Sequence, residues 1–153
     1  MFFNQFATLI MCRGIRWVMA VAIAVMATTA TVARAEVVVV VSPHNPLTGL
    51  NKKQLSNIFL GKSSQFPGGG RAEPINMKEG APDRKEFYSV YIGKSPAQIK
   101  QHWSKMIFTG RGQPPREVKS GDELKVLLAE NRSTIAYVEA SVVDDSMKVL
   151  AVN

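Results

Sequence analysis

The chain of 153 residues has little cysteine and histidine and no continuous basic sequence, and each shortage argues against a class of function. Its only cysteine is Cys12, so residues 36–153 contain no thiol and form no disulfide. The two histidines, His44 and His102, lie far apart with no cysteine partner, which argues against a zinc site. No run of Arg and Lys with interleaved aromatic residues occurs, so nothing indicates nucleic-acid binding.

Motifs for nucleotide binding and catalysis are also missing. Residues 61–63 and 93–95 both read Gly-Lys-Ser, like the end of a P-loop. The glycine that a P-loop requires five positions before its Gly-Lys pair is Ser56 in one case and Tyr88 in the other. No serine or cysteine sits in a recognisable nucleophile elbow, and the histidines fit no triad. We therefore expect neither an enzyme nor a cofactor.

The first 35 residues have the three parts of a cleavable signal peptide. Arg13 and Arg16 form a positive region, residues 18–32 are apolar apart from small hydroxyl residues, and residues 33–35 read Ala-Arg-Ala. The alternative is an uncleaved membrane anchor, which needs roughly 20 strongly apolar residues, and this run is shorter. We therefore expect cleavage of residues 1–35 and a periplasmic or secreted protein. Cys12 precedes the apolar run, so it is not a lipid-bearing residue.

Loss of the signal peptide would lower the net charge. Three of the 19 Lys and Arg residues and none of the 12 Asp and Glu residues lie in residues 1–35, which leaves +4 instead of +7. Such a charge favours anionic ligands or surfaces only weakly. We expect residues 36–153 to be a single domain, long enough to bury one core without disulfides.

Strand and helix signals alternate along residues 36–153. Five consecutive valines at residues 37–41 predict a strand buried on both faces, typical of the centre of a parallel α/β sheet. Further strands are expected at residues 72–77, 134–138 and 147–152. Helices are expected at residues 50–61, 82–91, 95–110 and 120–131. The pattern predicts an α/β fold, with a mixed sheet flanked by helices on both faces.

Capping signals mark the helix ends. Asn51 with Gln54, and Ser95 with Gln98, have the spacing of capping boxes, and Gly61 suits the left-handed position after a helix. In the helix at residues 95–110, four apolar side chains are expected to line one buried side: Ile99, Trp103, Met106 and Ile107.

In an open α/β sheet, ligands bind beyond the carboxyl ends of the strands, where helix N-termini offer free N–H groups. Polar side chains follow several expected strand ends, and an arginine stands between glycines in the loop at residues 110–115. We therefore expect one binding mouth formed by seven residues: Ser42, His44, Asn45, Asn76, Arg84, Arg111 and Tyr137.

Each of these residues also has a purely structural alternative. Arg84 could be neutralised by Asp83 or Glu86 as an ordinary surface residue. Residues 42–45 could form a simple turn, and Tyr137 could pack in the core. The loop around Arg111 could simply connect one helix or strand to the next, with no role in binding.

Four segments occur in the order seen in phosphate-type periplasmic binding proteins of ABC transporters, at residues 55–62, 74–87, 108–112 and 134–139. The strings Ile-Phe-Leu-Gly-Lys at 58–62 and Phe-Thr-Gly-Arg-Gly-Gln-Pro-Pro at 108–115 most resemble a subgroup of about half the usual length. The resemblance implies a type II periplasmic-binding-protein-like fold, with a reduced second lobe at about residues 95–118. It also implies a protein that grips a small anion such as phosphate and presents it to an ABC transporter permease or an envelope receptor.

The chain departs from that family where the anion would lie. The family's Gly-Ser-Gly-Thr-Arg turn corresponds to Gly-Ala-Pro-Asp-Arg at residues 80–84, which lacks two hydroxyls and one N–H and adds the charge of Asp83. Ser133 and Ala136 stand where the family has glycines. The alternative function is therefore an envelope interaction protein that keeps the fold without the ligand, docking through residues 66–71 or 111–115.

Overall fold

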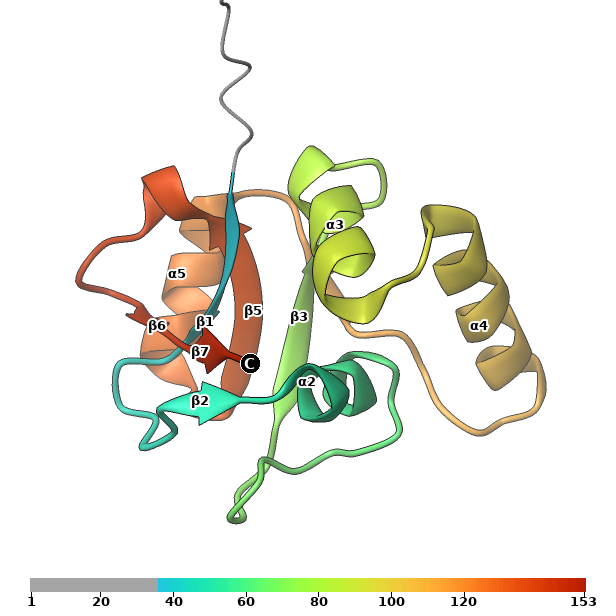
Figure 1. The fold of residues 1–153 in the computed structure, drawn as a ribbon, viewed down its shortest axis with the longest axis horizontal. Coiled ribbons are helices and arrows are strands. Elements are labelled where there is room, and N and C mark those ends of the chain that lie inside the picture. Colours follow the sequence, from blue (N-terminus) through green and yellow to red (C-terminus); the bar gives the residue numbers. More distant parts are fainter. Residues whose placement is uncertain (1–35) are drawn as a thin grey trace, which may run out of the picture. The chain divides into compact units, whose positions relative to one another are not determined.

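A five-stranded mixed sheet, in the order β4-β3-β5-β1-β6, forms the centre of the computed structural model, which describes residues 36–153. A second sheet pairs β2 with β7 (Figure 1). The predicted signal peptide lies outside the described residues. The strands are β1 (Val37–Val41), β2 (Gly49–Leu50), β3 (Glu73–Met77), β4 (Arg116–Val118), β5 (Thr134–Glu139), β6 (Lys148–Val149) and β7 (Ala151–Val152).

The helices begin and end where the capping signals predict. The Asn51 side chain accepts a hydrogen bond from the Gln54 N–H at 2.8 Å, and Gln54 Oε1 accepts one from the Asn51 N–H at 2.9 Å. Ser95 and Gln98 form the same box, and Gly61 has the expected left-handed φ of 69°. The helices are α2 (Lys52–Phe59), α3 (Pro82–Phe87), a π-helical turn (Tyr88–Ile92), α4 (Pro96–Phe108), α5 (Gly121–Glu130) and a 3-10 turn (Ala140–Val142). None of the helices in residues 36–153 has the length and apolar composition needed to cross a bilayer.

The strand directions differ from the expectation for the valine strand. β1 is antiparallel to both of its neighbours, β5 and β6, whereas β5 is parallel to β3 and β3 is parallel to β4. The prediction of a parallel β1 is wrong, because a run of valines specifies burial on both faces and not direction. The carboxyl end of β1 therefore lies at the opposite end of the sheet from the carboxyl ends of β3, β4 and β5.

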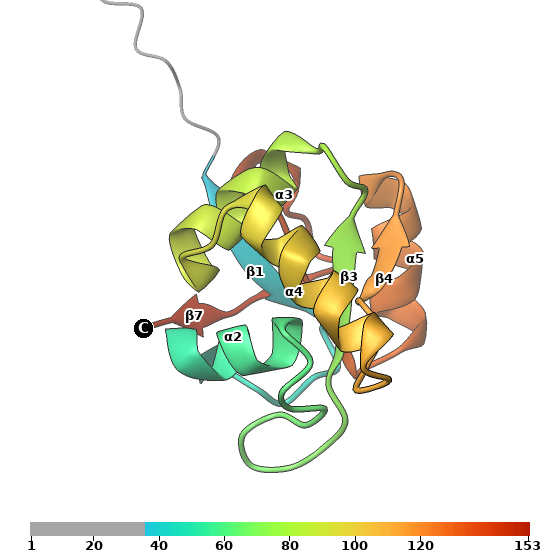
Figure 2. The same cartoon turned by 90° about the vertical axis from the view of Figure 1, so that its right-hand side faces the viewer.

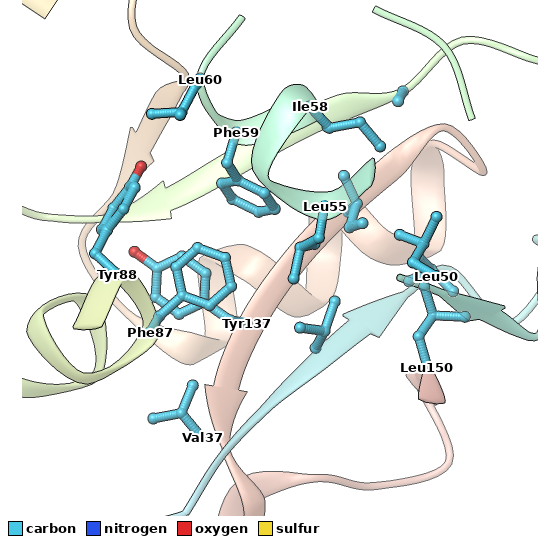
Figure 3. Packing of buried hydrophobic residues seen from close by; sticks show 14 of the residues in the cluster. Val37, Leu50, Leu55, Ile58, Phe59, Leu60, Phe87, Tyr88, Tyr137 and Leu150 are labelled. Atoms are coloured by element: carbon cyan, nitrogen blue, oxygen red, sulfur yellow. The ribbon is translucent and has the colours of Figure 1, made fainter. Parts of the chain in front are cut away.

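Helices cover both faces of the sheet, as predicted. Val37, Val39 and Val41 share one cluster with α2, α3 and Tyr137 (Figure 3), while Val40 joins the cluster on α5. Figure 2 shows α5 on one side of the sheet and α2 and α3 on the other. Each face of β1 thus packs against one layer of helices.

Two local predictions are corrected. The expected strand at 147–152 is divided into β6 and β7 in different sheets, because the Leu150 N–H still donates to the Val39 carbonyl of β1 at 2.9 Å whereas the Ala151 N–H donates to the Thr48 carbonyl, next to β2, at 3.3 Å. The expected buried side of α4 is narrower than predicted: Ile99 and Trp103 are buried, Met106 is partly buried, and Ile107 is 56 % exposed. Residues 95–118 consist of α4, a loop and β4, the edge strand beside β3 (Figure 2).

Candidate functional site

A cavity of about 310 Å³ opens beyond the carboxyl end of β3 and beside β4, near where the fold class predicts a ligand site. It lies between α3, α4 and the end of β4, and we call it the Arg84 cavity. Cationic, acidic and apolar side chains line it, among them Glu79, Arg84, Tyr88, Ile99, Lys100, Trp103, Ile107 and Glu117.

Arg84 is held firmly at the lip of this cavity. Its Nη1 donates to the Met77 carbonyl at 2.9 Å and forms an ion pair with Glu117. The arginine side chain is only 15 % exposed. This acidic partner is a residue of β4, which was not among the two considered from the sequence. The parallel register explains this, because Glu117 stands opposite Asn76 on the neighbouring strand.

Asn76 and Tyr137 do come together, as expected for residues of one site. Asn76 Oδ1 accepts hydrogen bonds from the Tyr88 hydroxyl at 3.0 Å and from the Tyr137 hydroxyl at 3.3 Å. The Met77 N–H donates to the Tyr137 hydroxyl at 3.2 Å. The Asn76 Nδ2 group is buried without a hydrogen-bond partner within the described part of the chain. This network joins β3, β5 and the π-helical turn.

The rings of this network also belong to the core. Tyr137 is fully buried, and its ring stacks on Phe87 with centroids 4.0 Å apart and an interplanar angle of 7° (Figure 3). Tyr88 lines the cavity and was missed by sequence reasoning. Its signal was its place one helical turn after Arg84, which puts the two side chains on the same side of the helix.

The two buried tyrosines predict a loss of stability in alkali. Burial raises the pKa of Tyr88 and of Tyr137 above the ordinary value of 10.0, so the folded protein keeps protons that the unfolded chain releases. The contribution of these tyrosines to the free energy of unfolding is therefore expected to be constant below about pH 10 and to fall above it, by at most about 1.4 kcal/mol per pH unit for each tyrosine. Urea unfolding at about pH 9 and about pH 11 measures the loss. Tyr137→Phe should reduce the difference, and equal stability at the two pH values would contradict the prediction.

Ser42, His44 and Asn45 lie at the other end of the sheet. Ser42 is buried and its carbonyl accepts from the Asn45 N–H at 2.9 Å, while His44 is exposed. Asn45 Nδ2 donates to the Arg132 carbonyl at 2.8 Å, and its Oδ1 accepts from the Leu47 N–H at 2.9 Å. The prediction that these residues share a mouth with Arg84 is wrong, because β1 runs antiparallel to β5 and therefore opposite to β3.

Arg111 is also apart from the Arg84 cavity. It follows α4 in an exposed loop, where its N–H donates to the Met106 carbonyl at 2.9 Å. Of the seven predicted residues, the structure thus gathers Asn76, Arg84 and Tyr137. Within residues 36–153, no group of three or more His, Cys, Asp and Glu side chains is arranged to hold a metal ion.

No family model matches the sequence, and no curated protein matches it. Solved structures do resemble the fold. An ABC-type phosphate transport receptor from Vibrio cholerae superposes with a TM-score of 0.60 at 20% identity, over 76% of this chain and 45% of that one. A phosphate ABC transporter substrate-binding protein with bound phosphate, from Clostridium perfringens, gives 0.59 at 22% identity, over 76% and 44%. PstS from Borrelia burgdorferi gives 0.58 at 16% identity, over 76% and 47%.

The chain spans less than half the length of each of these proteins. At such identities the likeness concerns the fold, and it confirms the α/β architecture and the half-length resemblance expected from the sequence. Residues 36–153 therefore have the fold of about one half of a phosphate-type substrate-binding protein.

Proposed function

We propose that this protein is an extracytoplasmic solute-binding protein that captures a small anion, phosphate or a related oxyanion, in the Arg84 cavity. The observation that carries the proposal is the fixed position of the Arg84 guanidinium at the lip of that cavity, held by the Met77 carbonyl and Glu117. A preorganised guanidinium binds oxyanions well because little side-chain entropy is lost when they bind.

Arg84 has donors left for a ligand. Both of its bonds within residues 36–153 use Nη1, so the N–H groups on Nε and Nη2 stay open. Lys100 lies across the cavity, 3.8 Å from Glu79 in an exposed ion pair. A bound anion would compete with Glu79 and Glu117 for these cations. The site is thus suited to a ligand that carries more charge than a single carboxylate.

The proposal includes a place of action and a partner. The signal peptide expected in residues 1–35 would export the chain, and the fold is shared with proteins described as phosphate transport receptors and transporter substrate-binding proteins. The anion would therefore be presented to an ABC transporter permease or an envelope receptor.

Isothermal titration calorimetry of the purified protein with phosphate and sulfate tests the anion site. Arg84→Ala is expected to weaken binding by more than about tenfold, because it removes charge-assisted hydrogen bonds. Arg84→Lys keeps the charge but loses the planar fork and should give an intermediate affinity. Arg116→Ala is the control, because Arg116 pairs with Glu123 at 3.6 Å and does not line the cavity. Unchanged affinity in Arg84→Ala would place the anion elsewhere.

A second candidate function is an envelope interaction protein without a small ligand. Specific observations favour it: Glu117 already neutralises Arg84, and Phe108 on α4 is 93 % exposed. The sequence between Glu86 and Glu117 holds no acidic residue but five basic ones, Lys94, Lys100, Lys105, Arg111 and Arg116. This basic segment with exposed apolar groups suits an acidic partner surface. If millimolar oxyanion gave no binding heat and left the melting temperature unchanged, anion binding would be rejected in favour of this second function.

A further inference from the structure

A second cavity, also of about 310 Å³, lies at the opposite end of the sheet from the Arg84 cavity. It is formed where β1 ends and where β3 and β5 begin, and the loop of residues 66–70 closes one side. We call it the Arg71 cavity. The lining residues that matter for its chemistry are Asn45, Leu47, Phe66, Arg71, Arg132 and Ser133.

Two arginines, Arg71 and Arg132, line this cavity. β3 and β5 are parallel, with Glu73 paired to Thr134, and the Glu73 N–H donates to the Ser133 carbonyl at 2.8 Å. Arg71 and Arg132 each lie two residues before these paired positions, and both line the cavity. Adjacent like charges are unfavourable unless an anion lies between them.

No acidic side chain relieves this pair of charges within the described residues. The lining of the Arg71 cavity includes no Asp or Glu, and neither arginine forms an ion pair with another described residue. Two acidic residues lie two positions from these arginines along the chain: Glu73 accepts a hydrogen bond from Asn131 Nδ2 at 2.9 Å, and Glu130 is exposed at the end of α5. A further cation, Lys148 Nζ, donates to the Asn45 carbonyl at 3.1 Å. The side chains that line the cavity therefore carry a net positive charge.

Hydrogen bonds and a buried side chain hold the walls of the cavity in place. Asn45 Nδ2 fixes the Arg132 carbonyl at 2.8 Å, and the Phe66 N–H donates to the Gly70 carbonyl at 3.0 Å. Phe66 is only 8 % exposed, and with Leu47 it gives the cavity an apolar side. Gly68, Gly69 and Gly70 all have positive φ, which allows the loop to turn back tightly over this side.

We infer that the Arg71 cavity binds a small organic dianion, with its charged end between Arg71 and Arg132 and its apolar body against Phe66 and Leu47. Two guanidiniums suit a phosphate monoester or a pair of carboxylates, which both accept several charge-assisted hydrogen bonds. A volume of about 310 Å³ is at the low end of the range for organic ligands and far larger than a bare oxyanion requires. This site is independent of the Arg84 cavity and of the function proposed for it.

Phenyl phosphate and phthalate are the probes, added to the purified protein while amide signals are followed by two-dimensional NMR. Saturable shifts are expected at Gly68, Gly69, Gly70 and Ser133. Arg71→Gln and Arg132→Gln should each weaken the binding of the stronger probe by about tenfold or more. Lys53→Gln, an exposed change on α2 with the same loss of charge, should leave the affinity unchanged. Inorganic phosphate should shift these amides more weakly than phenyl phosphate.

Several outcomes would overturn the inference. One is the absence of saturable shifts at residues 68–70 and 133 with either probe at millimolar concentration. Another is equal binding of phenol, which would show an apolar pocket without anion recognition. A third is unchanged affinity in both arginine variants while circular dichroism shows that they are folded. Because Arg84→Ala affects only the other cavity, it should leave phenyl phosphate binding intact at this site, so the two proposals can fail separately.

Discussion

Replacing Phe87 with alanine is expected to lower the free energy of unfolding by about 3–5 kcal/mol. The Phe87 ring is fully buried, stacks on Tyr137 at 4.0 Å and lies 4.6 Å from the Phe59 ring. Its neighbours come from α2 and β5, so removal of the ring leaves a cavity that no single element can fill by shifting. The loss is a large part of the roughly 5–15 kcal/mol that stabilises an ordinary domain.

Equilibrium unfolding in urea, followed by circular dichroism, measures this loss. Phe108→Ala is a matched control, because it removes the same ring from a position that is 93 % exposed. It should change the free energy of unfolding by no more than about 0.5 kcal/mol. Similar losses in the two variants would show that the stacked rings around Phe87 are not the centre of the core.

Asn76→Ala is expected to be the next most damaging change, with a loss of about 2–4 kcal/mol. The Asn76 amide oxygen is the shared acceptor for the hydroxyls of Tyr88 and Tyr137. Its removal leaves the Tyr88 hydroxyl buried without this partner, which costs more than the lost hydrogen bond itself. The unpartnered Nδ2 group of Asn76 is lost at the same time, which limits the damage.

A double-mutant cycle separates the hydrogen bond from the packing. Tyr88→Phe is measured in the natural protein and in Asn76→Ala, again by urea unfolding. If the amide oxygen is the partner of the hydroxyl, Tyr88→Phe should cost about 1 kcal/mol less in the Asn76→Ala background. Additive losses would mean that Asn76 acts only through its volume.

The helices were predictable because their signals are local. Asn51 and Gln54 are three residues apart, and their side chains satisfy each other's backbone groups whatever the rest of the chain does. The direction of β1 was not predictable in this way, because it depends on pairing with residues about a hundred positions later. β4 has only three residues after two prolines, too short a stretch for any periodic pattern.

Only the part of the candidate site that lies on the paired strands β3 and β5 could be predicted from the sequence. Asn76 and Tyr137 both lie on strands that the sequence indicates, and pairing of Glu73 with Thr134 brings them together. Glu117 was missed together with β4, so the sequence suggested that an acidic residue could neutralise Arg84 but did not identify this partner. Arg71 and Arg132 lie just before two strands, and their proximity follows only once those strands are known to be parallel neighbours.

The pairing of β1 also determines when the protein can fold. Val37 pairs with Glu139 and Val41 with Ile135, and the other neighbour of β1 is still later in the sequence. During synthesis this strand therefore has no partner until residues 135–139 have been made, and contacts of such long range form slowly. An unpaired run of five valines is the kind of segment that pairs with other chains. The delay before β1 finds its partner is thus the period in which the chain is most exposed to aggregation.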